Sequence, residues 1–220
     1  HGFFRWLTES LVPVIIKVAA WFPQKNYHIS LSLHKITGLG HKIFNLPYGI
    51  DISPIDGSVW YSKLYSGYIG RLDPKTLQVE EIETPLAGPR RLRFSQDGTL
   101  WIPSYEESGL MKFNPTSKKF TPYKIPTLAP DEFETPYALN IHPQTQEVWI
   151  TAGLSDRILR FIPSSESFIS YPLPTRVTSM REIVFTHDGQ VCSSYSNLPA
   201  YSIEGGLPKI VCISTSDQVQ

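Results

Sequence analysis

The stretch PYGIDISPIDGSVWYSKLYSGYIGRLDPKT, residues 47–76, recurs in altered form further along the chain. The later copies open at Pro89 and Pro136, and a weaker copy opens near Met180. Each copy carries a short apolar segment, a turn, a strand-like pair such as Val-Trp, and a second apolar segment. A repeat of roughly 45 residues indicates an array of supersecondary units.

Each unit has the pattern of four short strands. In the first copy, residues 49–53 alternate apolar and polar side chains, and residues 58–62 are rich in residues that favour strands. The Asp56-Gly57 pair between them is a hairpin signal, because glycine tolerates the positive φ of tight turns. Residues 68–72 and 79–82 follow as a third and a fourth strand. Four antiparallel strands per repeat, without helical periodicity, predict a β-propeller blade.

We therefore expect an all-β chain: a β-propeller of four-stranded antiparallel blades, three complete and others partial, forming an arc of a six- or seven-bladed propeller. A closed four-bladed ring is the alternative. The recurring tryptophans are expected to pack between neighbouring blades rather than to stack on a ligand. The predicted division is an unassigned N-terminal segment 1–27, a partial blade 28–46, full blades 47–88, 89–135 and 136–178, and a last blade 179–220.

Composition limits the partners. Lys plus Arg and Asp plus Glu both number 20, so no basic excess favours a nucleic acid or an anionic membrane. The apolar segment 11–22 is too short for a bilayer span, which needs ~20 residues, and it contains Pro13 and Lys17. Cys192 and Cys212 fall on adjacent expected strands with an offset of about one residue pair, so two thiols are favoured over a disulfide. No cysteine or histidine set has metal-ligand spacing.

The repeats resemble those of the virginiamycin B lyase (streptogramin lyase) family, which are β-propellers related to NHL-repeat and gluconolactonase-like propellers. The resemblance covers about residues 28–215. The motifs that carry it are Pro47-Tyr48-Gly49-Ile50, Val59-Trp60-Tyr61-Ser62, Ile69-Gly70-Arg71-Leu72-Asp73-Pro74, Pro136-Tyr137-Ala138-Leu139 and Val148-Trp149-Ile150-Thr151. The resemblance implies a bacterial periplasmic or secreted protein. It also implies an elimination that opens a cyclic depsipeptide antibiotic, with a His as acid or base and a Mg²⁺ held partly by Glu.

Neither catalytic residue type stands at the positions that the resemblance assigns to it. The family's His follows the opening residue of a blade, where this chain has Tyr48, Arg90, Tyr137 and Arg181. The family's Glu stands three residues after the blade's Trp, where this chain has Lys63, Ser104, Ala152 and Tyr195. Enzymatic activity therefore stays open, and no cofactor is evident in the residues themselves.

Two loops per blade lie at the same end of a propeller and converge on its channel. The candidate ligand-binding residues on them are Tyr48, Arg90, Arg91, Tyr137, Arg181 and Glu182 from the segments that lead into each blade, and Lys63, Tyr105, Glu106, Tyr195 and Asn197 from the second set of loops. One interpretation is a structural lining of the channel. The other is recognition of an anionic or carbonyl-rich ligand, because Arg offers a bidentate fork and Tyr a stacking face with a donor.

We expect a monomer that binds a small molecule or a peptide-like ligand. The alternatives are a Mg²⁺-dependent streptogramin-type C–O lyase, acting with further blades or through substitutes such as Glu106, Glu107 and Glu182, and a gluconolactonase-like hydrolase. Three basic residues that recur on the third strands are expected to be structural: Arg71, Lys112 and Arg160.

Overall fold

The computed structural model describes residues 46–64, 66–175, 178–195 and 209–214, which contain strands and turns but no helix. The chain divides into two compact units, His1–Phe44 and Asn45–Gln220, and the described residues all belong to the second. The predicted N-terminal segment 1–27 and almost all of the partial blade 28–46 lie outside the described residues. Leu46, expected at the end of that partial blade, instead pairs with Leu64 inside the first described sheet.

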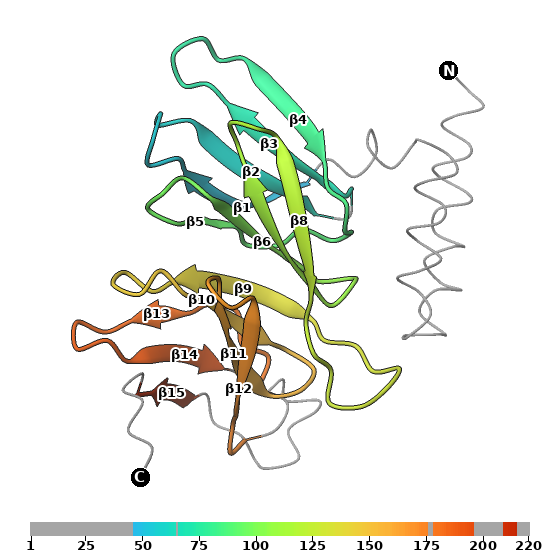
Figure 1. Ribbon diagram of the computed structural model, residues 1–220, viewed down its shortest axis with the longest axis vertical. Helices are drawn as coiled ribbons and strands as arrows, with labels where there is room; N and C mark the ends of the chain where they lie inside the picture. The colour runs from blue at the N-terminus through green and yellow to red at the C-terminus, as the bar shows by residue number, and fades with distance from the viewer. Residues whose placement is uncertain (1–45, 65, 176–177, 196–208, 215–220) are drawn as a thin grey trace. The chain divides into compact units, whose positions relative to one another are not determined.

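The described strands form four antiparallel sheets, each with its strands side by side in chain order (Figure 1). The first sheet contains β1 (Leu46–Ile52), β2 (Val59–Leu64), β3 (Tyr68–Leu72) and β4 (Val79–Glu83). The second contains β5 (Arg93–Phe94), β6 (Leu100–Ser104), β7 (Gly109–Asn114) and β8 (Lys119–Lys124). The third contains β9 (Pro136–Ile141), β10 (Val148–Ala152), β11 (Arg157–Ile162) and β12 (Ser167–Pro172). The last contains β13 (Val184–Phe185), β14 (Val191–Tyr195) and β15 (Lys209–Ile213). The all-β, propeller-type fold is confirmed.

The hairpin between the first two strands of a sheet is held by an acidic side chain. In the first sheet, Asp56 accepts hydrogen bonds from the amide of Ser58 at 3.0 Å and from its hydroxyl at 2.6 Å. The same hydroxyl accepts a hydrogen bond from the indole of Trp60 at 2.8 Å. Asp97 repeats the arrangement with Thr99 in the second sheet. Burial raises the pKa of Asp97, but a hydrogen bond from Ser95 and those from Thr99 outweigh it, and the bonds from Ser58 act likewise on Asp56, so both aspartates have a pKa below its ordinary value.

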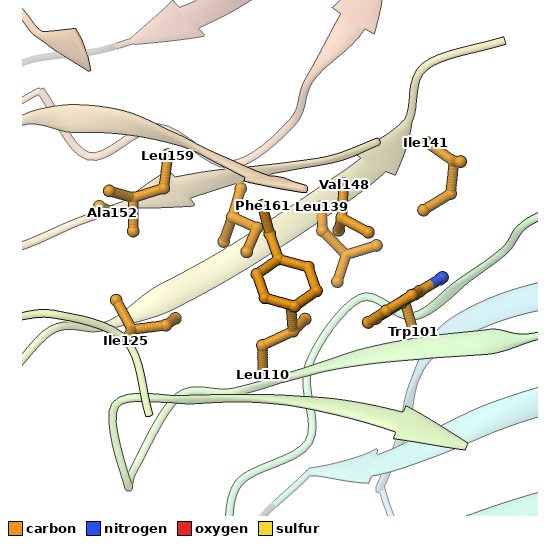
Figure 2. Packing of buried hydrophobic residues seen from close by; sticks show 10 residues of the cluster. Trp101, Leu110, Ile125, Leu139, Ile141, Val148, Ala152, Leu159 and Phe161 are labelled. Atoms are coloured by element: carbon orange, nitrogen blue, oxygen red, sulfur yellow. The ribbon is translucent and has the colours of Figure 1, made fainter. Parts of the chain in front are cut away.

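Neighbouring sheets are joined by the recurring tryptophans, as predicted. Trp60 of the first sheet packs with Leu92, Leu100 and Phe113 of the second. Trp101 of the second packs against the third, and Figure 2 shows it among the aliphatic side chains and Phe161 of that sheet. Trp149 packs with Met180, Ile183 and Val191 of the last sheet. The same kind of apolar contact, made by a tryptophan of one sheet with the next sheet, therefore recurs between neighbouring sheets.

The basic residues on the third strands interact electrostatically with acidic side chains in the hairpins of their own sheets. Arg71 pairs with Asp56 at 2.9 Å, and Arg160 forms two bonds to Glu147 at 2.8 and 2.9 Å. Lys112 lies close enough to Asp97 to lower its pKa. These contacts give all three residues the structural role expected of them.

The expectation of two separate thiols is wrong, because Cys192 and Cys212 form a disulfide between β14 and β15. The register places the two cysteines directly opposite each other, with their Cα atoms 4.1 Å apart. The offset of one residue pair assumed from the sequence depended on the long connection between these strands, whose length hides the pairing register.

Removing this disulfide should destabilise the chain. The bond links residues 20 positions apart, and closing a loop of this size restricts the unfolded chain by about 3 kcal/mol. We expect the double variant C192A/C212A to lose about 2–3 kcal/mol in urea denaturation, and a reducing agent to act on the wild type alone. Equal sensitivity of both proteins to the reducing agent would contradict the assignment.

Candidate functional site

The segments that lead into the innermost strands are shaped by β-bulges. In the first sheet, the pairing of β1 with β2 shifts between Pro47 and Ile50, and the pairing of β9 with β10 shifts at the equivalent place in the third sheet. The extra residue of a bulge turns a side chain out of the regular alternation of the strand. Tyr48 and Tyr137 stand at these two places and are thereby presented in the same way.

A buried hydroxyl on the second strand stabilises each bulge. Ser62 Oγ accepts a hydrogen bond from the amide of Gly49 at 2.9 Å, and Thr151 Oγ1 accepts one from the amide of Ala138 at 3.0 Å. In the other two sheets a hydroxyl also reaches the leading segment: Ser104 donates to the carbonyl of Ala87, and Ser193 to that of Glu182. The residues predicted above do not include these hydroxyls. Their sequence signal was a Ser or Thr one to three positions after the Trp of each copy, or after Cys192 in the last.

The leading segments of neighbouring sheets are in backbone contact. The amide of Arg91 donates to the carbonyl of Tyr137 at 3.4 Å, and Arg91 and Ala138 form a parallel bridge. On the other side, a Cβ atom placed on Gly49 would lie 2.5 Å from the carbonyl oxygen of Arg90. Only glycine allows this approach, which brings the side chains of consecutive blades together.

Tyr137 is the centre of an aromatic–arginine cluster, defined here as Tyr48, Arg90, Tyr105, Tyr137 and Arg181. Its hydroxyl shares a hydrogen bond with the hydroxyl of Tyr48. The ring centroids of Tyr48 and Tyr105 each lie 6.0 Å from that of Tyr137 in edge-to-face geometry, with interplanar angles of 84° and 82°. Four consecutive sheets thus contribute to one cluster.

Two arginines contact the rings of this cluster in different ways. The guanidinium carbon of Arg90 lies 4.1 Å from the centroid of Tyr105, and 5.6 Å from those of both Tyr48 and Tyr137. Arg90 is only 6% exposed, so its charge is held in a nearly dry aromatic surrounding. Arg181 is exposed, and its guanidinium carbon lies 5.4 Å from the centroid of Tyr137.

The remaining charges at the edge of the cluster partly neutralise each other. Arg91 pairs with Glu182 at 2.5 Å, and Arg93 reaches the same carboxylate at 3.6 Å. Arg181 forms no ion pair with any residue that the structure describes. It is therefore the accessible cation of the cluster, with an aromatic face beside it.

Of the remaining predicted site residues, Lys63 lies away from this cluster, and the structure does not place the side chains of Tyr195 and Asn197. The ammonium of Lys63 is fully buried and bonds both oxygens of Glu81 at 2.8 and 3.0 Å, on the outermost strand of its sheet. For Tyr195 only the backbone is described, where it pairs with Lys209. Asn197 lies outside the described residues.

Glu106 lies beside the cluster and has an unusual environment for a carboxyl group. It is 8% exposed, and its side chain packs on Gly88, whose φ is +66°. Burial raises its pKa from 4.5 to about 7, the charge of Arg90 opposes that rise, and the neighbouring Glu107 adds to it. Near neutral pH this carboxyl can therefore either donate or accept a proton.

Among the described residues, the potential metal ligands do not fit the Mg²⁺ implied by the resemblance. Across the described ranges, no three His, Cys, Asp or Glu residues are grouped so that they could hold a metal ion.

In the same part of the chain, the structure contains no helix of the length and apolarity needed to cross a membrane.

The fold is that of known β-propellers. The structure superposes on virginiamycin B lyase from Staphylococcus aureus with a TM-score of 0.61 and 21% identity, covering 68% of this chain and 48% of that one. A catalytically inactive variant of that enzyme with quinupristin gives 0.64 and 21%, covering 78% and 53%. Kuenenia stuttgartiensis hydrazine synthase gives 0.60 and 17%, covering 71% and 44%. The chain thus spans about half the length of the lyase chains, and identities this low establish the fold alone. No protein-family model and no curated protein matches the sequence.

The close approach at Gly49 should be sensitive to a single methyl group. We expect G49A to lower the free energy of unfolding by roughly 2–3 kcal/mol, because the new Cβ meets backbone atoms that cannot rotate away. The matched control is G57A, where φ is +71° but nothing lies within 4 Å, and about 1 kcal/mol is expected. Urea denaturation measures both, and equal losses would contradict the role of Gly49.

Replacing Glu106 should stabilise the protein at high pH only. Below its ordinary pKa of 4.5, Glu106 is protonated in the folded and unfolded chain alike. As the pH rises from 4.5 to about 7, the unfolded chain ionises first, so stability is lost until the folded pKa is passed. We expect E106Q to gain about 2–3 kcal/mol at pH 8 and to match the wild type at pH 4 in urea denaturation. A gain of the same size at both pH values would exclude ionisation as its cause.

Proposed function

We propose that this β-propeller is a monomeric binding protein for a small or peptide-like ligand that carries a carboxylate, bound at the aromatic–arginine cluster. The observation that carries the proposal is the exposed guanidinium of Arg181 beside Tyr137, itself in contact with Tyr48 and Tyr105. A planar guanidinium binds a carboxylate through two parallel hydrogen bonds, and phenol rings pack on peptide-like groups at low cost in side-chain entropy.

The charges around the cluster favour an anion over a cation. Three arginines, Arg90, Arg91 and Arg181, lie within 6 Å of the ring of Tyr137 by their guanidinium carbons. Glu182 offsets one of these charges through its bond to Arg91. The surplus is positive even in a chain whose net charge is zero.

The disulfide supports a periplasmic or secreted location for such a protein. Disulfides persist in oxidising compartments and are rare in the cytosol of most organisms. Cys192 and Cys212 are therefore consistent with a binding protein exposed to extracellular peptides or small acids.

A second candidate is an eliminating or hydrolysing enzyme that uses Glu106 as its base. The observation that favours it is a buried carboxyl whose pKa of about 7 suits acid–base catalysis near neutral pH. The fold likeness to virginiamycin B lyase is in keeping with it. Among the described residues, however, no metal-ligand group accompanies this carboxyl to stabilise an enolate-like charge.

Arg181 provides the cleanest test of binding, because its exposure separates ligand contact from folding. We expect R181A to weaken binding of N-acetylphenylalanine by at least about tenfold in isothermal titration calorimetry, the loss expected for a charge-assisted hydrogen bond. The melting temperature should stay nearly unchanged. R71A, which removes an arginine paired with Asp56 on β3, is the matched control and should bind normally.

Two results would contradict the proposal. N-acetylphenylalanine amide, which lacks the carboxylate, should bind much more weakly than the acid, and equal binding of both would exclude an anion site. Weakening of the same size in R71A and R181A would show a general charge effect instead of a contact.

A further inference from the structure

Glu106 occupies a place that the backbone keeps open for it. A Cβ atom on Gly88 would lie 2.7 Å from Cγ and 3.0 Å from Cδ of Glu106. Gly88 also adopts a positive φ of +66°, which other residues rarely tolerate. The side chain of Glu106 therefore packs against the backbone of the segment that leads to Arg90. The packing of the hydrophobic core does not need a carboxyl group at this position.

The charged and titratable groups that face Glu106 come from two elements. Arg90, on the segment leading into β5, favours the ionised carboxylate, and Glu107, in the same loop as Glu106, disfavours it. Tyr105 precedes Glu106 and stacks on the guanidinium of Arg90. Glu106 is 8% exposed as a residue, and within the described residues its carboxyl takes part in no hydrogen bond or ion pair. Burial outweighs the attraction of Arg90, so the proton is held to about neutral pH.

The described histidines do not provide an alternative source of pH dependence at the cluster. His142 follows the far end of β9, whose beginning carries Tyr137. His187 follows β13 in the hairpin toward β14, at the end opposite Arg181. Glu106 is therefore the group beside the cluster that changes charge near neutral pH.

We propose that the aromatic–arginine cluster is a proton-linked anion site, in which Glu106 takes up a proton from solvent when a carboxylate ligand binds. The inference rests on the proposed function, since it concerns the same site. An ionised Glu106 carboxylate reduces the positive potential around Arg90 and repels the carboxylate of the ligand. A bound carboxylate makes ionisation of Glu106 less favourable, and by linkage protonation of Glu106 strengthens binding of the carboxylate.

The test compares binding of N-acetylphenylalanine at pH 5.5 and pH 8.5 by isothermal titration calorimetry. The probe stays ionised throughout, because α-carboxyl groups titrate near pH 3.5. We expect the wild type to bind about fivefold more tightly at pH 5.5, the change produced by a shift of somewhat less than one pKa unit. Titration at pH 7 in two buffers of different ionisation enthalpy should show uptake of a fraction of a proton per ligand.

The variants separate Glu106 from other causes. E106Q, which keeps the shape and stays neutral, should bind at pH 8.5 about as tightly as the wild type does at pH 5.5, with no proton uptake. E107Q removes the exposed neighbouring charge, which raises the pKa of Glu106, so this variant should keep the proton uptake but with its midpoint moved to lower pH. Identical pH dependence in the wild type and E106Q would overturn the proposal. G88A, which closes the seat of the carboxyl, should alter proton uptake, and unchanged uptake in that variant would also count against it.

The outcomes for the two proposals differ. Binding of N-acetylphenylalanine that is the same at both pH values, without proton uptake, would leave the binding function standing and refute the linkage. Absence of binding by the wild type, E106Q and E107Q at both pH values would instead refute the binding function on which the linkage rests.

Discussion

The backbone approach between the leading segments of neighbouring blades is the constraint on which the candidate site depends. Gly49 lets the first sheet come within contact of Arg90, and the bond from Arg91 to Tyr137 continues the contact into the third sheet. Tryptophan packing joins neighbouring sheets through their apolar faces, and the leading segments are in backbone contact as well. Side chains separated by about 90 residues, such as Tyr48 and Tyr137, are neighbours only because of this approach.

The three arginines at the cluster carry the same charge but lie in different surroundings. Arg90 is buried among aromatic rings, where its desolvation is offset by their quadrupoles. Arg91 is neutralised by Glu182, and Arg181 is left accessible to solvent. Burial raises the pKa of Glu106 and so favours the neutral form of its carboxyl group. A ligand bound at the cluster would therefore contact one accessible cation, Arg181. The net charge around the second cation, Arg90, would depend on whether Glu106 is protonated.

The repeat made the fold and the core predictable, because the period of the strands and the place of the tryptophans are local properties of the chain. It also predicted that Tyr48, Arg90, Tyr137 and Arg181 would lie close together, since each follows the residue that opens a blade. The pairing of Lys63 with Glu81 was not predictable, because Lys63 on β2 reaches Glu81 on β4 across β3, and this contact depends on the register of three strands. The disulfide was missed for a related reason: register across the long β14–β15 connection is set by tertiary contacts. Glu106 was named as a site residue, but its raised pKa required knowledge of its burial.

The structure also separates the residues that build the propeller-type fold from those that the fold presents at the inner edge of the sheets. In the first and third sheets, a bulge sets the direction of the side chain after the opening residue, and a buried hydroxyl, that of Ser62 or Thr151, stabilises the bulge. Neither device depends on the identity of the side chain that it presents. Tyr48, Arg90, Tyr137 and Arg181 at these positions present aromatic faces and permanent cations, while the strands, the tryptophan packing and the backbone contacts are formed by other residues of the repeat. Architecture and chemistry are thus specified by different residues of the same repeat.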